Sequence, residues 1–156
     1  MEKNNLLKDF EREFEKFKKE YKFKASFEEL EKEFSIKDFV LEEGFVREDF
    51  SISICLRIVD HFRNWAGYLN NLLLPNPSFM VSSTEAKLFN SEKDRKEIWE
   101  VIKKCMYFSS KHSLITLNKD DKIQAEFIDE ALNSWKNYVK PFVKKTMQRI
   151  FDAWKE

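Results

Sequence analysis

The stretch Asp49–Leu74, DFSISICLRIVDHFRNWAGYLNNLLL, decides how the rest of the chain can fold. At helical spacing it has two apolar stripes, so a helix here is apolar around most of its circumference. Such a helix is usually buried, with partners on several sides. Pro75 and Pro77 end it, because proline lacks an N–H and disfavours helical geometry in the preceding residue. We therefore predict a buried central helix over residues 50–74. The stripes are Ile52, Cys55, Leu56, Val59, Phe62, Ala66, Leu69 and Leu73, and Ile54, Ile58, Trp65, Tyr68 and Leu72.

Two other structures are compatible with parts of this stretch. It is long enough to cross a membrane, but Arg57, Asp60 and Arg63 lie inside it. Charges at that depth are costly in lipid, so we predict a soluble core helix and no membrane contact. The alternation at residues 52–56 is also typical of a strand. The helical pattern continues to Leu73, and we therefore favour the helix.

The composition favours an all-α fold. The 156 residues include sixteen Phe and four Trp but only two Gly and three Pro. Few Gly and Pro leave little material for the tight turns that β-hairpins need. The length suits one domain with a proper core. We predict an all-α, single-domain helical bundle over residues 1–156.

The N-terminal part of the chain is predicted to be helical with a break. Apolar residues recur at intervals of three and four among charged ones, which indicates an amphipathic helix that begins near Asn4 or Asn5. Ser26 followed by Glu29 has the form of a capping box, so a second helix is expected there. A bend in one long helix over residues 4–34 is the alternative. The apolar positions are Leu7, Phe10, Phe14, Phe17 and Tyr21, and then Phe23, Phe27, Leu30 and Phe34.

Short connectors flank the central helix. Ser35 and Asp38 repeat the capping pattern and Gly44 is a natural C-terminal stop, which predicts a short helix or turn over residues 36–43. Asp49 is a plausible N-cap for the central helix.

The segment after that helix, PNPSFMVSS (75–83), is predicted to be an extended loop. Its apolar residues 79–81 are expected to pin the loop to the core. Ser82 or Ser83 would cap a short turn beyond it.

Two more helices complete the predicted bundle. Ser91 with Asp94 opens one over residues 92–112, which weakens where Ser and β-branched residues accumulate. Asn118 or Asp120 caps a last helix over residues 119–154, and Pro141 should kink or restart it. The expected buried faces are Ile98, Trp99, Ile102, Cys105, Met106 and Ser109 in the first, and Ile123, Phe127, Ala131, Trp135, Tyr138, Phe142, Ile150 and Trp154 in the second.

Charge is balanced overall but not along the chain. Residues 1–50 carry eleven Lys and Arg against fifteen Asp and Glu, and residues 133–156 carry six against two. The total of 28 against 28 gives no global attraction to nucleic acid or anionic lipid. The simplest use of the opposed ends is docking, within one chain or between two copies.

Metal, disulfide and secretory signals are absent from the sequence. Cys55 and Cys105 belong to no CxxC motif and to no Cys/His cluster, so we expect no metal and no cofactor. Two cysteines do not suggest a disulfide scaffold. The N-terminal residues contain no apolar signal core, which favours a cytoplasmic location.

A polar line along the central helix carries candidate residues for a catalytic site. His61 lies beside it, and Arg57 is three residues from Asp60 and four from His61, so these side chains can meet. Either the line reaches solvent or pairs with neighbouring charges, or it lines a site. The line is Ser53, Arg57, Asp60, Asn64, Gly67 and Asn71.

The run His61–Tyr68, HFRNWAGY, resembles the Arg-polar…His/Tyr signature of HEPN domains. These are all-helical proteins, many of them RNA-cutting, that act as dimers in toxin and defence systems. The histidine that usually follows Arg63-Asn64 is missing, and Tyr68 stands near its place. The other possible Arg–His pair of the signature, Arg57 and His61, is separated by too few residues. The resemblance implies an RNA-cleaving site formed by Arg57, His61, Arg63, Asn64 and Tyr68.

A basic stripe on the last helix offers binding without catalysis. Its residues lie roughly along one face and could follow the phosphates of a nucleic acid. They are Lys136, Lys140, Lys144, Lys145 and Arg149. His112, in a polar run, is expected to be a cation at a helix end.

The sequence therefore favours a non-enzymatic helical interaction or adaptor protein. We expect it to self-associate or to bind another protein, because no convincing catalytic constellation is present and the ends carry opposite charge. An RNA-binding or HEPN-like RNA-cleaving protein is the alternative. A small-molecule pocket among the many Phe and Trp residues is a third possibility.

Overall fold

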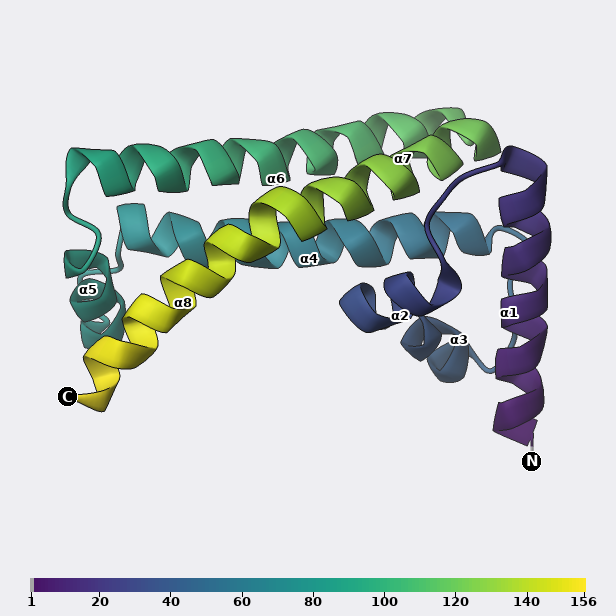
Figure 1. The fold of residues 1–156 in the computed structure, drawn as a ribbon, viewed down its shortest axis with the longest axis horizontal. Helices are drawn as coiled ribbons and strands as arrows, with labels where there is room; N and C mark the ends of the chain where they lie inside the picture. The colour runs from purple at the N-terminus through teal and green to yellow at the C-terminus, as the bar shows by residue number, and fades with distance from the viewer. Residues whose placement is uncertain (1) are drawn as a thin grey trace. The chain divides into compact units, whose positions relative to one another are not determined.

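A computed structural model describes residues 2–156, and every regular element in them is a helix (Figure 1). The all-α prediction is confirmed. The elements are α1 (Glu2–Tyr21), α2 (Phe27–Phe34), α3 (Lys37–Glu43), α4 (Phe50–Leu73), α5 (Met80–Lys87), α6 (Glu92–Asn118), α7 (Asp121–Ser134), the π-helical turn η1 (Trp135–Val139) and α8 (Lys140–Lys155). None of the helices in this part of the chain is both long enough and apolar enough to cross a bilayer.

The chain divides into two compact units. The first unit contains the residues up to His61 and Lys111–Leu132, and the second contains Phe62–Ser110 and Asn133–Glu156. Three helices, α4, α6 and α7, therefore run from one unit into the other. The expectation of a single domain stays a prediction.

The predicted central helix is confirmed, and α4 contributes buried side chains to both units. Residues 52–56 are helical, so the strand alternative for them was wrong. Burial follows one broad face, and Leu56, assigned to an apolar stripe, is 44% exposed. The buried residues are Phe50, Ser51, Ile54, Cys55, Ile58, Val59, Phe62, Ala66, Leu69 and Leu72.

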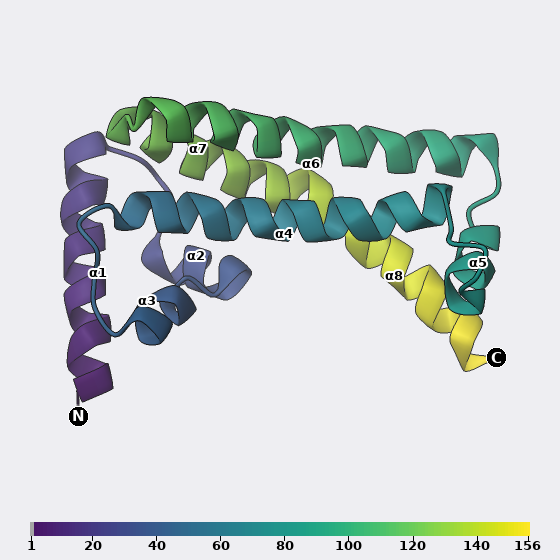
Figure 2. The ribbon, with the colours of Figure 1, turned by 180° about the vertical axis from the view of Figure 1, so that it is seen from behind.

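Phenylalanine rings form the core of the first unit. Figures 1 and 2 show α1, α2 and α3 around the first half of α4. Phe10 and Phe14 of α1 are fully buried, and both rings meet Phe27 edge-to-face, at 5.1 and 5.3 Å between centroids. Phe50 of α4 meets Phe10 in the same way at 5.7 Å. Such pairs contribute roughly 0.5–1.5 kcal/mol beyond the apolar area they bury.

The break after α1 is confirmed, and side chains fix its geometry. The Ser26 hydroxyl accepts the Glu29 amide (3.1 Å), and the Glu29 carboxylate accepts the Ser26 amide (3.2 Å), which completes the capping box. The Asp129 carboxylate of α7 accepts the amides of Lys24 and Ala25 at 2.7 Å each. The Asp129 carboxylate thus holds the loop between α1 and α2, and the capping box fixes where α2 begins.

The capping role predicted for Ser35 was wrong. Ser35 has φ 52°, ψ 52° and is the left-handed C-cap of α2, and its amide bonds the Glu31 carbonyl. Ile36 precedes α3 without a side-chain cap. The Ser-x-x-Asp spacing was misleading because Ser35 caps the C-terminus of α2 and not the N-terminus of α3. Gly44 ends α3 as predicted, with φ 81°.

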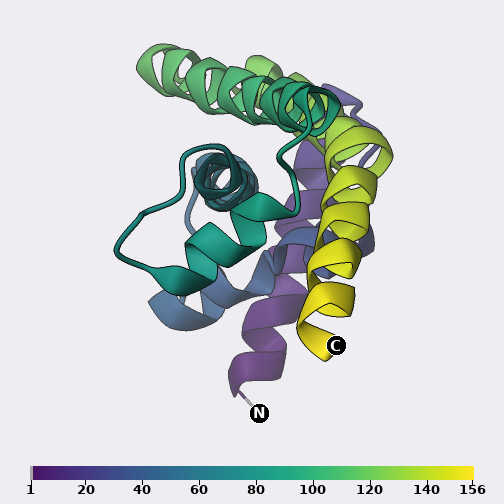
Figure 3. The same cartoon turned by 90° about the vertical axis from the view of Figure 1, so that its left-hand side faces the viewer.

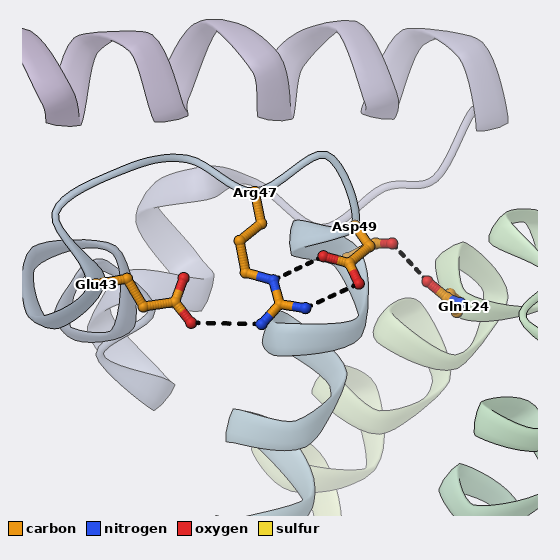
Figure 4. Close-up of polar contacts among 5 residues, drawn as sticks. Glu43, Arg47, Asp49 and Gln124 are labelled. Carbon is orange, nitrogen blue, oxygen red and sulfur yellow. Dashed lines mark hydrogen bonds and ion pairs between the residues drawn. The ribbon is translucent and has the colours of Figure 1, made fainter.

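A polar clamp holds the loop between α3 and α4, as Figure 4 shows. The Arg47 guanidinium donates to both Asp49 oxygens, at 2.8 and 3.1 Å, and lies 3.7 Å from Glu43. At the start of α4 the Ser51 hydroxyl bonds the side-chain oxygen of buried Gln124. These contacts fix where α4 begins.

Aromatic packing also organises the second unit. Phe62 stacks on Phe108 of α6 at 4.9 Å and meets the Trp135 ring edge-on at 5.9 Å. Near the start of α6, Arg149 pairs with Asp94 at 3.1 Å, and its guanidinium carbon lies 4.7 Å from the Phe89 ring centroid.

The helix predicted over residues 92–112 continues to Asn118. Its start is as predicted, because the Ser91 hydroxyl accepts the Asp94 amide. The prediction that the helix ends at residue 112 was wrong. Ile115 is buried, and the Thr116 hydroxyl donates to the His112 carbonyl. Burial of an apolar face outweighs the weak helix propensity of Ser and Thr. Trp99 and Met106, expected to be buried, are 50% and 45% exposed, and Val101 and Phe108 are buried instead.

The last helical segment is interrupted just before Pro141, as this proline led us to predict. Asp120 caps α7 through the amides of Lys122 and Ile123. The π-helical turn η1 precedes α8, and Pro141 is in the first turn of α8. The buried face continues with Val139, Val143, Thr146 and Ile150, whereas Tyr138 and Trp154, expected in the core, are exposed.

Candidate interaction surface

The candidate surface lies in the second unit, where α5 follows the end of α4. Pro75 and Pro77 end α4, and the Asn76 side chain accepts the Ser78 amide at 2.9 Å. The chain then enters α5, which Figure 3 shows below the end of α4, as do Figures 1 and 2. The local sequence therefore places a short helix at the end of a long one.

The apolar residues at the start of α5 lie on the surface, and the prediction that they pin the segment to the core was wrong. Phe79, Met80 and Val81 are 56%, 81% and 41% exposed. Phe79 is the extended residue before the helix, and Met80 and Val81 lie in its first turn. Ala86 and Phe89 occupy the buried side instead. The helix also begins at Met80, ahead of the serines expected to cap it.

Glu85 connects α5 to both neighbouring helices. One carboxylate oxygen accepts the Tyr68 hydroxyl at 2.8 Å, and the other accepts the Trp154 indole N–H at 3.0 Å. Burial and then the Glu85 carboxylate raise the pKa of Tyr68 above its ordinary value, so the phenol keeps its proton. The end of α8 is therefore held against α5.

Large apolar side chains are exposed at the end of α4, at the start of α5 and in the last turns of α8, and we call them the α5–α8 patch. The exposed fractions are 71% for Leu74, 60% for Phe151 and 53% for Trp154, in addition to those at the start of α5. The patch consists of Leu74, Phe79, Met80, Val81, Phe151 and Trp154. Burial of one such side chain contributes roughly 1.5–3 kcal/mol. This surface can therefore stabilise a complex.

A cavity of about 430 Å³ opens beside the patch. Phe79 and Val81 line it, together with Asn71 and Ser82. The Ser82 hydroxyl oxygen is buried and has no hydrogen-bond partner among the described residues. A partner's side chain that fills the cavity could bring the missing hydrogen bond, as an anchor residue does in a protein interface.

The candidate catalytic residues have separate partners in their own units. In the first unit Arg57 pairs with Asp38 (2.8 Å) and donates to the Phe34 carbonyl (3.2 Å), and His61 meets the Phe34 ring edge-on at 5.3 Å. Burial and then the Arg57 charge lower the pKa of His61.

In the second unit Arg63 donates to the Ser109 hydroxyl at 2.8 Å, and Tyr68 donates to Glu85. Asn64 is exposed, as are Asp60, Gly67 and Asn71 of the polar line. Arg63 and Tyr68 thus bond different helices, α6 and α5. Catalysis by these residues stays a prediction.

The residues of the predicted basic stripe have different surroundings, and their binding of nucleic acid stays a prediction. Arg149 is engaged by Asp94, by the Leu88 carbonyl and by the Phe89 ring. Lys136 and Lys144 are exposed, and Lys140 is half-buried. Lys145 lines a hollow together with residues of α6.

Both cysteines are buried. Burial raises the pKa of the Cys55 thiol far above its ordinary value and that of Cys105 to about 12, so neither is a thiolate at neutral pH. Across residues 2–156 no three His, Cys, Asp or Glu side chains form a group that could hold a metal ion.

Comparison with models of known protein families, with curated proteins and with solved structures gives no match to this chain. The function must therefore be inferred from the geometry of the molecule.

Proposed function

We propose that this protein is a non-catalytic helical interaction protein, and that its α5–α8 patch contacts a second copy of the chain. The observation that carries the proposal is the exposure of six large apolar side chains, each between 41% and 81%, around one helix junction. Contiguous exposed apolar surface marks interaction sites in soluble proteins. The adjoining cavity gives such a contact a place for an anchor side chain.

Charge favours a second copy as the partner. The second unit, which carries the patch, has thirteen Lys and Arg against seven Asp and Glu, a net charge of +6. The first unit has fifteen against twenty-one, a net charge of −6. A patch-to-patch contact would bring two basic units together, which costs free energy. We therefore propose a heterologous contact, in which the patch of one copy meets the acidic unit of the next.

Sedimentation velocity over a protein concentration series tests this proposal. We expect a species larger than the monomer at 50 mM salt, and a smaller fraction of it at 1 M salt, because the Debye length falls to about 3 Å there. Phe151→Ser should shift the equilibrium toward monomer. Trp99→Ser is the matched control, because Trp99 is 50% exposed on α6, outside the patch.

Three results would contradict the proposal. A monomer at every concentration would remove self-association. Equal dissociation by Phe151→Ser and Trp99→Ser would place the contact elsewhere. Association that strengthens with salt would indicate an apolar contact without charge steering. Far-UV circular dichroism of both variants checks that the helices are retained.

A further inference from the structure

The π-helical turn changes which residues of the last helical segment reach the surface. The Lys140 amide bonds the Trp135 carbonyl, five residues back, where an α-helix would bond four back. The turn therefore rotates the following residues. Val139 is fully buried and Tyr138, the residue before it, is 45% exposed. Turns of this kind are frequent at functional sites.

Tyr138 lines a groove along α6 within the second unit. Two hollows, of about 550 and 490 Å³, share Glu100 and Tyr138 in their walls and so adjoin one another. We call them together the α6 groove. Its α6 wall extends from Lys96 to Tyr107, which corresponds to about 16 Å of helix.

The groove presents aromatic faces and amide groups side by side. Tyr107 is 46% exposed, and the Lys104 ammonium lies 5.6 Å from its ring centroid. Asn137 donates to Asn133 at 2.7 Å, and both amides line the same hollow as the two tyrosines. Exposed aromatic rings stack on nucleobases of any sequence, and amides can bond their polar edges.

Lysines stand at both ends of the groove. Lys96 and Lys145 line one hollow, and Lys103 and Lys104 line the other. Lys103 lies 2.7 Å from Glu100, so the acidic residue shared by the hollows is already paired. Four lysines thus face two glutamates, in a unit of net charge +6.

We infer that the α6 groove binds a short segment of single-stranded nucleic acid. The bases would stack on Tyr107 and Tyr138, and phosphates would contact the lysines at both ends. Cations at both ends of a groove this long suit a strand of several nucleotides better than one nucleotide. This inference does not depend on self-association, because no residue of the α5–α8 patch lines the groove.

Fluorescence anisotropy with the full-length protein tests the inference. The probes are labelled twelve-nucleotide poly-U RNA and poly-dT DNA, a duplex of equal length and labelled poly-glutamate, each from 50 to 300 mM salt. We expect both single strands to bind more tightly than the duplex, with affinity that falls steeply as salt rises. A difference between RNA and DNA identifies the preferred strand.

Paired variants locate the site. Tyr138→Ala should weaken single-strand binding about 5- to 100-fold through lost stacking, whereas Trp99→Ala, an exposed aromatic on α6 that does not line the groove, should leave it unchanged. Lys104→Glu should weaken binding and flatten the salt dependence. Lys155→Glu makes the same charge change at an exposed position of α8 that does not line the groove, and should have a much smaller effect.

Four results would overturn the inference. They are no binding at 50 mM salt, equal binding of the duplex, equal binding of poly-glutamate, and equal effects of the Lys104 and Lys155 variants. Self-association measured on Tyr138→Ala separates the two proposals, since this variant should assemble as the wild-type chain does.

Discussion

The Asp129 carboxylate shows how one side chain can fix the path of a loop. It accepts the amides of Lys24 and Ala25, which no helix satisfies because they lie between α1 and α2. The sequence gives no sign of this contact, since Asp129 is more than a hundred positions away from both amides. The capping box at Ser26, by contrast, is local and was predicted.

Asp129→Ala should lower the free energy of unfolding by about 1–3 kcal/mol, because two backbone donors lose a charged acceptor. Urea unfolding followed by far-UV circular dichroism measures the change. Asp152→Ala is the matched control, because Asp152 bonds only Gln148 on the exposed surface of α8 among the contacts found. Its effect should stay below about 0.5 kcal/mol. Equal losses would show that Asp129 does not hold the loop.

His61 should make stability depend on pH. Burial and the Arg57 charge lower its pKa in the folded protein below the ordinary value near 6.5. As the pH falls from about 7 to 5, the unfolded chain gains this proton and the folded chain resists it, so the free energy of unfolding decreases. The stability from this group is complete above pH 7 and is lost toward acid.

His61→Gln should reduce that decrease, as measured by urea unfolding at pH 7.5, 6.5 and 5.5. The carboxylates whose pKa values are lowered, such as Asp49 and Asp94, lose their contributions at lower pH than this window. An unchanged pH dependence in His61→Gln would contradict the assignment.

At the scale of elements, the sequence predicts what local signals control. Caps and stops at Ser26, Gly44, Ser91 and Asp120 are found where local pattern placed them. The length of α6 was not predictable in this way, because tertiary burial of Ile115 outweighs weak local propensity.

The α5–α8 patch and the α6 groove were not predicted either, because they depend on tertiary packing and not on local sequence signals. Exposure of residues 79–81 contradicts the expectation that apolar residues pin a loop. The rotation by η1 is a second case, because a proline indicates an interruption without giving its geometry.

We predict different losses of stability for substitutions at two adjacent residues of the π-helical turn, Tyr138 and Val139. Val139→Ala should lower the free energy of unfolding by about 2 kcal/mol, since it removes buried methyl groups and leaves a cavity. Tyr138→Ala should have a smaller effect, because this side chain is 45% exposed. Urea unfolding of the two variants, monitored by far-UV circular dichroism, measures both changes. A loss in Tyr138→Ala equal to or larger than that in Val139→Ala would contradict the prediction.

At the scale of the molecule, charge separation follows the two units more closely than it follows the ends of the chain. The sequence shows a net −4 in residues 1–50 and +4 in residues 133–156. Grouped by unit the separation is −6 against +6. The increase arises because residues distant in sequence, such as 111–132, belong to the acidic unit. This distribution supports both proposed contacts, with an acidic partner surface and with a strand of phosphates.

The shared helices predict that the two units unfold together. Because α4, α6 and α7 run through both, loss of one unit would interrupt three helices of the other. The four tryptophans, Trp65, Trp99, Trp135 and Trp154, all belong to the second unit. Tryptophan fluorescence therefore reports on that unit, whereas far-UV circular dichroism reports on all helices. We expect the two urea transitions to coincide.

Asp129→Ala provides the decisive comparison, because this change lies in the first unit, which contains no tryptophan. If the chain is one cooperative domain, the variant shifts the fluorescence midpoint as much as the circular dichroism midpoint. If the units are independent, the fluorescence midpoint stays at the wild-type value while the circular dichroism curve splits. The second outcome would replace the single domain with two, joined through continuous helices.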